Sequence, residues 1–130
     1  MAGRLAGKVC VVTGTGGSMG RATALTFARE GALVVGCDVT VEPAAATVEM
    51  VRAAGGQMVS LHPCLLGDPA ECARLVDLAV SEFGRIDVLY NLAARAHFSV
   101  WKTSPTRSGM RRAGTRWTWC STSRVRRGRI

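Results

Sequence analysis

The first hundred residues alternate between short, strongly apolar runs and longer amphipathic segments. Runs that are rich in β-branched residues and bounded by glycine, proline or polar residues are typical of buried strands. We expect strands at residues 8–13, 32–37, 57–62 and 86–90. Apolar residues recur at helical spacing over residues 18–30, 42–54 and 69–83. This alternation implies right-handed crossovers and a parallel sheet covered by helices on both faces. The predicted fold class is α/β, with a sheet that stops after its fourth strand.

Several residues predict where the helices begin and end. Asp68 is a good N-cap for the helix at 69–83, and Gly31 and Gly84 stand where a glycine stops a helix. One apolar stripe is expected along the helix at 69–83. Its predicted members are Cys72, Leu75, Val76, Ala79 and Val80.

A glycine-rich turn, residues 13–20, lies between the first strand and the first helix. Glycines there let the backbone turn sharply and approach a pyrophosphate, whose charge is met by free N–H groups at the helix N-terminus. Such turns are common in α/β domains, so a purely structural turn is the alternative. The position between a strand and a helix favours dinucleotide binding. The residues of this turn predicted to contact the dinucleotide are Gly14, Thr15, Gly17, Ser18, Met19 and Gly20.

An acidic residue follows the second strand. Asp38 lies eighteen residues after Gly20, where a carboxylate can accept hydrogen bonds from the adenosine ribose hydroxyls. A carboxylate there repels a 2′-phosphate, and no Arg or Lys immediately follows Asp38. The predicted cofactor is therefore NAD rather than NADP.

Residues 4–100 resemble the N-terminal half of a short-chain dehydrogenase/reductase. The resemblance rests on TGTGGSMG, VVGCD and FGRIDVLYNLAA. It implies a Rossmann-like domain, and a full-length relative that transfers a hydride between an alcohol or carbonyl substrate and a nicotinamide cofactor. Thr13, Gly14 and Gly20 match the family's glycine fingerprint. Ser18 replaces its middle glycine, and Met19 replaces an isoleucine.

The resemblance also assigns roles after the third and fourth strands. Leu65 replaces an aspartate that commonly contacts the adenine amino group, while Leu66 is expected to pack on the adenine ring. Asn91 is expected to steady the end of the fourth strand. Ala93 is expected to lie against the ribose on the nicotinamide side.

The residues that carry out the family's chemistry are absent from these 130 residues. The family uses a tyrosine as acid and base, a lysine four residues later and a serine that binds the substrate oxygen. The single tyrosine, Tyr90, is followed at that spacing by Ala94, and the lysines are Lys8 and Lys102. No catalytic residue is assigned, and His97 is interpreted as an ordinary loop histidine. We expect a truncated, inactive cofactor-binding fragment.

Charge divides the chain in two. The net charge of +8 averages a value of −1 over residues 1–100 and +9 over residues 101–130, where nine Lys and Arg occur without an acid. We therefore predict a dinucleotide-binding domain at 1–100 and a basic tail at 101–130. The tail is open to three interpretations: a nucleic-acid-binding arm, a solvated segment without function, or translation out of frame.

Reverse translation favours the third interpretation. In one shifted frame the tail encodes an acidic loop followed by two helices, much as the family has after its fourth strand. Some of those residues depend on the codons chosen. The alternative function, from another class, is a nucleotide- or nucleic-acid-binding module with a functional basic arm.

The remaining expectations concern compartment and partners. Five cysteines occur without CxxC spacing, which favours free thiols in a reducing cytoplasm over a metal site or disulfides. No apolar run approaches the ~20 residues of a membrane span. The predicted partner is a nicotinamide dinucleotide, with no membrane, and the sequence gives no basis for an oligomer.

Overall fold

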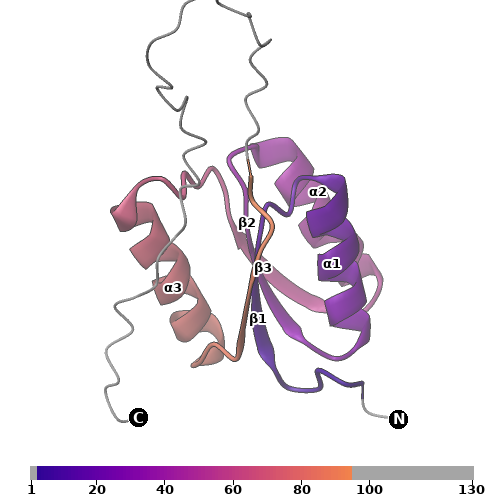
Figure 1. Cartoon of the computed structure of the whole chain (residues 1–130). Coiled ribbons are helices and arrows are strands. Elements are labelled where there is room, and N and C mark those ends of the chain that lie inside the picture. Colours follow the sequence, from indigo (N-terminus) through magenta and orange to yellow (C-terminus); the bar gives the residue numbers. More distant parts are fainter. Residues whose placement is uncertain (1–2, 95–130) are drawn as a thin grey trace, which may run out of the picture.

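The computed structural model describes residues 3–94, and these form a single sheet with three helices (Figure 1). The expected order of strands and helices is confirmed. The elements are β1 (Val9–Thr13), α1 (Ser18–Arg29), β2 (Leu33–Cys37), α2 (Val41–Ala53), β3 (Gln57–Leu61), α3 (Pro69–Phe83) and β4 (Val88–Asn91). The predicted tail at 101–130, the domain boundary before it and His97 lie outside the described residues.

The four strands are parallel and lie in the order β3-β2-β1-β4. The chain thus runs from β1 outward through β2 to β3, and then crosses to the other side of β1 to form β4. Ligands of open α/β sheets bind at such a reversal, beyond the carboxyl ends of the strands. In this sheet the reversal lies between β1 and β4, so the ligand crevice is expected beyond the carboxyl ends of these two strands.

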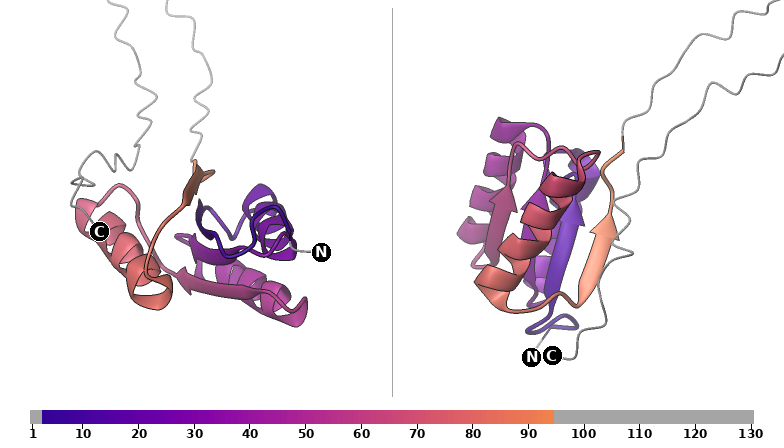
Figure 2. Two further views of the ribbon diagram at one scale, coloured as in Figure 1. Left: turned by 90° about the horizontal axis from the view of Figure 1, so that it is seen from below. Right: turned by 90° about the vertical axis from the view of Figure 1, so that its left-hand side faces the viewer.

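Helices cover both faces of the sheet, α1 and α2 on one and α3 on the other (Figure 2). Alternate residues of β1 supply the two cores because successive strand side chains point to opposite faces. Cys10 and Val12 pack beneath α1 and α2, while Val9 and Val11 pack beneath α3. The prediction of a parallel sheet with helices on both faces is confirmed.

The residues predicted to begin and end α3 do so in the structure. The Asp68 side chain accepts a hydrogen bond from the Ala70 N–H at 2.8 Å, and Gly84 ends the helix in the left-handed region at φ +78°. The expected apolar stripe needs one correction, because Val80 is 49% exposed. Val80 lies five residues after the buried Leu75, which turns it about 140° away from the core at 100° per residue. Leu78 and Phe83 pack against the core instead.

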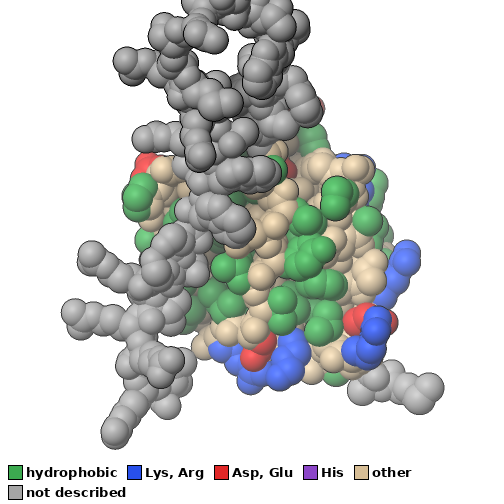
Figure 3. Space-filling model, viewed as in Figure 1, with side chains coloured by type: hydrophobic (Ala, Val, Ile, Leu, Met, Phe, Trp, Pro, Cys, Tyr) green, Lys and Arg blue, Asp and Glu red, His purple; other side chains and the backbone are tan. Residues whose placement is uncertain are grey.

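Apolar side chains remain accessible along β4. Within the described residues β4 pairs only with β1. Its Leu89 and Tyr90 are 39% and 41% exposed, and Ile86, which precedes the strand, is 38% exposed. Figure 3 shows hydrophobic side chains gathered over the middle of this face, where β4 runs in Figure 1. The Tyr90 ring meets the Phe27 ring edge to face, with the ring centroids 5.7 Å apart.

Candidate functional site

The glycine turn begins directly at the end of β1 and is tied to the end of β2. Gly14 has a φ of +78°, a conformation that side chains disfavour. The N–H groups of Gly14 and Thr15 both donate to the Cys37 carbonyl, at 2.8 and 3.2 Å. The turn therefore has a fixed position relative to the residue that follows β2, Asp38.

The N-terminus of α1 opens onto this turn. Its N-cap is Gly17, no side chain among residues 3–94 caps it, and its first turn contains no acid. The first helical hydrogen bond runs from Arg21 N–H to the Gly17 carbonyl at 2.9 Å. Ser18 and Met19 are exposed, Met19 to 68%. Backbone N–H groups and the positive end of the helix dipole are thus available to an anion, as the glycine pattern predicts.

Gly20 lets α1 start this close to the turn. A Cβ built on Gly20 would lie 2.0 Å from the Gly14 carbonyl oxygen and 2.9 Å from Thr15 Cα, both backbone atoms. Only a residue without a side chain fits between the helix and the turn. The Gly14 and Gly20 positions thus have a physical reason to be glycine.

Asp38 lies against the same turn. Its Oδ2 accepts the Gly16 N–H at 2.8 Å, and its Oδ1 accepts the Thr40 N–H at 2.8 Å and the Thr40 hydroxyl at 2.6 Å. Partial burial acts to raise the pKa of this carboxyl, but hydrogen bonds from Thr40, Gly16 and Val39 together hold the pKa below its ordinary value. Asp38 is therefore a fixed negative charge at neutral pH, one residue beyond β2.

The end of β4 meets the turn from the other side. The buried Thr13 hydroxyl accepts the N–H groups of Leu92 and Ala93, at 3.0 and 3.1 Å. A Cβ built on Gly14 would lie 3.1 Å from the backbone of Ala93. Asn91 is exposed and pairs in register with Thr13. The ends of β1 and β4 are thus held together where the crevice begins.

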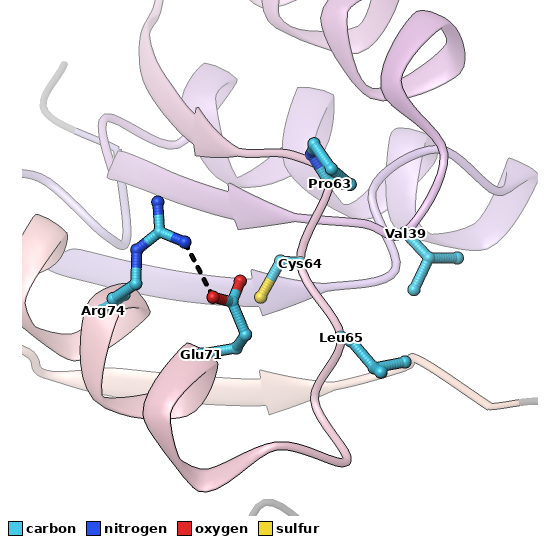
Figure 4. A pocket seen from close by; sticks show the side chains of 6 residues that line it. All are labelled: Val39, Pro63, Cys64, Leu65, Glu71 and Arg74. Atoms are coloured by element: carbon cyan, nitrogen blue, oxygen red, sulfur yellow. Dashed lines mark hydrogen bonds and ion pairs between the residues drawn. The ribbon is translucent and has the colours of Figure 1, made fainter.

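A cavity of about 410 Å³ lies between Val39, which follows Asp38 in sequence, and the segment that follows β3 (Figure 4). Val39 and Leu65 line its apolar part, and an ion pair joins Glu71 to Arg74 at 2.7 Å on its α3 side. Leu65 is 63% exposed. Leu66, predicted to pack on an adenine ring, is half-buried and packs against the core beneath α3. It is not among the residues that line the cavity in the described part of the chain.

The thiols of Cys64 and of the neighbouring Cys37 are held in their protonated form. Cys64 lines the cavity, burial raises the pKa of the Cys64 thiol, and burial together with the neighbouring Cys64 raises that of Cys37. Protonated thiols are poor nucleophiles and poor metal ligands. Within residues 3–94, no group of three or more His, Cys, Asp or Glu is placed to hold a metal ion.

Most of the predicted site residues lie together at the carboxyl end of the sheet. They are Gly14, Gly17, Ser18, Met19, Gly20, Asp38, Asn91 and Ala93. Thr15 differs because it is fully buried, with its hydroxyl 3.4 Å from the Cys37 carbonyl and its own carbonyl accepting the Thr47 hydroxyl at 2.7 Å. Its side chain supports the turn from beneath.

Three further residues shape the site and were not singled out as binding residues. Thr13 holds the end of β4, Thr40 holds Asp38, and Val39 lines the cavity. Val39 and Thr40 directly follow Asp38 in sequence, and this adjacency could have identified them as site residues. The contact of Thr13 with Leu92 and Ala93 spans about eighty residues, so no local sequence pattern could have identified it.

No helix within residues 3–94 is long and apolar enough to cross a bilayer.

Comparison with known proteins gives one consistent result. The family model for short chain dehydrogenase matches residues 8–111. The 7alpha-hydroxysteroid dehydrogenase of Escherichia coli is 37% identical over 90 residues, which cover 69% of this chain and 35% of that protein. The 3-oxoacyl-[acyl-carrier-protein] reductase FabG of Thermotoga maritima is 39% identical over 92 residues, covering 69% of this chain and 36% of that protein.

Solved structures agree with the sequence matches. A short chain dehydrogenase from Mycobacterium avium superposes with a TM-score of 0.70 at 39% identity, covering 73% of this chain and 37% of that one. A 7 alpha-hydroxysteroid dehydrogenase complexed with NADH and 7-oxo glycochenodeoxycholic acid gives a TM-score of 0.64 at 36% identity, covering 66% of this chain and 33% of that one. The chain thus spans about a third of the length of these relatives.

Proposed function

Since the chain belongs to the short-chain dehydrogenase family, we propose that it binds NAD at the carboxyl end of its sheet. One observation carries the proposal: the uncapped N-terminus of α1 and the fixed Asp38 carboxylate both meet the glycine turn. The first suits the pyrophosphate and the second the adenosine ribose.

Different residues of the chain are proposed to contact different parts of the cofactor. Gly14, Gly17 and Gly20 let the backbone approach the pyrophosphate, with Ser18 and Met19 supplying exposed N–H groups of the first helical turn. The cavity between Val39 and Leu65 has the apolar walls that an adenine ring requires. We propose Asn91 and Ala93 as neighbours of the nicotinamide half. Leu66 is proposed to act from beneath, by supporting the loop that carries Leu65.

The bound cofactor supplies hydride transfer, which is the chemistry of NAD-dependent oxidoreductases. We propose that residues 1–130 bind the cofactor and do not turn over an alcohol or a carbonyl compound. The single tyrosine, Tyr90, packs on Phe27 from within β4, and Ala94 stands where the family's lysine would follow it. No residue in the described part of the chain is assigned as acid or base.

The Asp38→Asn variant tests the preference for NAD over NADP. Removing the charge removes the repulsion of a 2′-phosphate and weakens the hydrogen bonds to the ribose hydroxyls. We expect NADH to bind about tenfold more weakly, which corresponds to about 1.4 kcal/mol, and the preference over NADPH to fall by more than that factor. Isothermal titration with both dinucleotides measures this.

Asp77→Asn is the matched control, because Asp77 is exposed on α3 away from the turn. It should bind both dinucleotides as the unaltered chain does. An Asp38→Asn variant that kept the original preference would refute the assignment of Asp38.

We also propose that residues 101–130 are read in a shifted frame. The proposal rests on the abrupt change from −1 to +9 in net charge. Sequencing the gene across codon 100 is expected to show, in another frame, a continuation with a tyrosine and a lysine at the family's spacing. An intact frame with no such stretch in any frame would refute the idea.

A further inference from the structure

Thr40 stands at the N-cap of α2, but its side chain bonds to Asp38 instead of capping the helix. Its backbone is in extended conformation with φ −96° and ψ 122°. An N-cap threonine usually accepts a hydrogen bond from the second or third N–H of its helix. Among the described residues, the Thr40 side chain makes no such capping bond. Its hydroxyl instead donates to Asp38 Oδ1 at 2.6 Å.

This contact fixes the carboxylate between two segments. Oδ1 is held by the Thr40 hydroxyl and N–H, and Oδ2 is held by the Gly16 N–H at 2.8 Å. Hydrogen bonds to an ionised carboxylate are among the stronger ones in proteins. The negative charge is thereby bound on one side to the glycine turn and on the other to the start of α2, and it cannot rotate without breaking one of these bonds.

Gly16 lies close against this pair on the side of the glycine turn. A Cβ built on Gly16 would lie 2.8 Å from Thr40 Oγ1 and 2.9 Å from Asp38 Oδ2. The three residues are therefore packed against one another. The backbone N–H of Thr40 holds Oδ1 whatever side chain stands at position 40, so the hydroxyl is the part that a substitution can remove by itself.

We propose that Thr40 is a positioning residue that strengthens the preference for NAD over NADP by fixing the Asp38 carboxylate against the glycine turn. The inference rests on the proposed function. A carboxylate that is free to turn away can yield to a 2′-phosphate, whereas one held at both oxygens cannot. The Thr40 hydroxyl bonds to the Asp38 carboxylate and makes no capping bond to α2. We therefore assign this hydroxyl a role in cofactor recognition.

Three substitutions in the complete 130-residue chain test the proposal. Thr40→Val removes the hydroxyl and keeps the shape, Thr40→Ser keeps the hydroxyl, and Thr26→Val makes the same change at an exposed position of α1. Equilibrium titration with NADH and with NADPH gives two dissociation constants for each protein. In Thr40→Val the NADPH dissociation constant divided by the NADH dissociation constant should fall about fivefold, because NADH binds more weakly and the freed carboxylate yields to the 2′-phosphate of NADPH. Thr40→Ser and Thr26→Val should stay within about twofold of the unaltered chain.

A second measurement separates this role from a general loss of stability. The pKa of the Asp38 carboxyl, followed by NMR without cofactor, should rise in Thr40→Val and return toward its original value in Thr40→Ser. A merely structural residue would change both dissociation constants alike and leave that pKa unchanged.

The outcomes separate the two proposals. If the unaltered chain binds NADH and Thr40→Val keeps the full preference, the role of Thr40 is refuted and the proposed function stands. If the unaltered chain binds neither dinucleotide, the proposed function and the role of Thr40 fall together.

Discussion

Replacing Gly20 by alanine should destabilise the domain by about 3 kcal/mol or more, although alanine is the better helix former by about 1 kcal/mol. Gly20 lies in the first turn of α1, and its added Cβ would meet the Gly14 carbonyl oxygen at 2.0 Å and the Gly14 carbonyl carbon at 2.6 Å. Both are backbone atoms of a turn that Cys37 holds in place. Relief requires α1 to move away from the sheet, so the packing cost exceeds the gain in helix propensity.

Urea denaturation followed by circular dichroism measures this loss, and NADH titration should show that binding is lost with it. Gly17→Ala is the matched control in the same turn, since its Cβ would lie 3.6 Å from the Gly14 carbonyl oxygen, an ordinary contact. It should change the free energy of unfolding by less than about 1 kcal/mol. A Gly20→Ala variant as stable as Gly17→Ala would show that α1 does not start where the structure places it.

The second large effect is expected at Thr13, which holds the end of β4. Its buried hydroxyl accepts two backbone N–H groups, from Leu92 and Ala93. Thr13→Val keeps the branched shape that suits a strand and removes this acceptor. With each lost hydrogen bond worth about 1 kcal/mol, we expect the free energy of unfolding to fall by about 2 kcal/mol.

Thr13→Ser provides the control, because it keeps the hydroxyl and loses only a methyl group. It should recover more than half of the loss measured by urea denaturation. Hydrogen exchange should further show faster exchange of the Leu92 and Ala93 amides in Thr13→Val. Equal exchange in the two variants would contradict the assigned hydrogen bonds.

The sequence predicted the order of the elements because their signals are local. Periodicity separates residues 9–13 from 18–29, and Asp68 and Gly84 mark the two ends of α3 through contacts within a few residues. Val80 was misassigned because a stripe drawn by hydrophobicity ignores that the residue lies well round the helix from Leu75.

The site was predictable only in part. The glycine turn and Asp38 follow from a pattern in which each residue has a local reason. The hold of Thr13 on Leu92 and Ala93 depends on the pairing of β1 with β4, which spans most of the described chain. The hydrogen bond from the Thr40 hydroxyl to Asp38 could not be predicted from the sequence either, because an N-cap threonine is expected to bond to its own helix.

The central claim is that the glycine turn, the start of α1 and Asp38 form a site for NAD. Titration of the complete chain with NADH and with NADPH, at one salt concentration, tests it most directly. We expect saturable one-to-one binding of NADH and binding of NADPH that is at least about tenfold weaker, because the 2′-phosphate meets the Asp38 carboxylate. A folded chain that binds neither dinucleotide, or that binds NADPH more tightly, would contradict the claim.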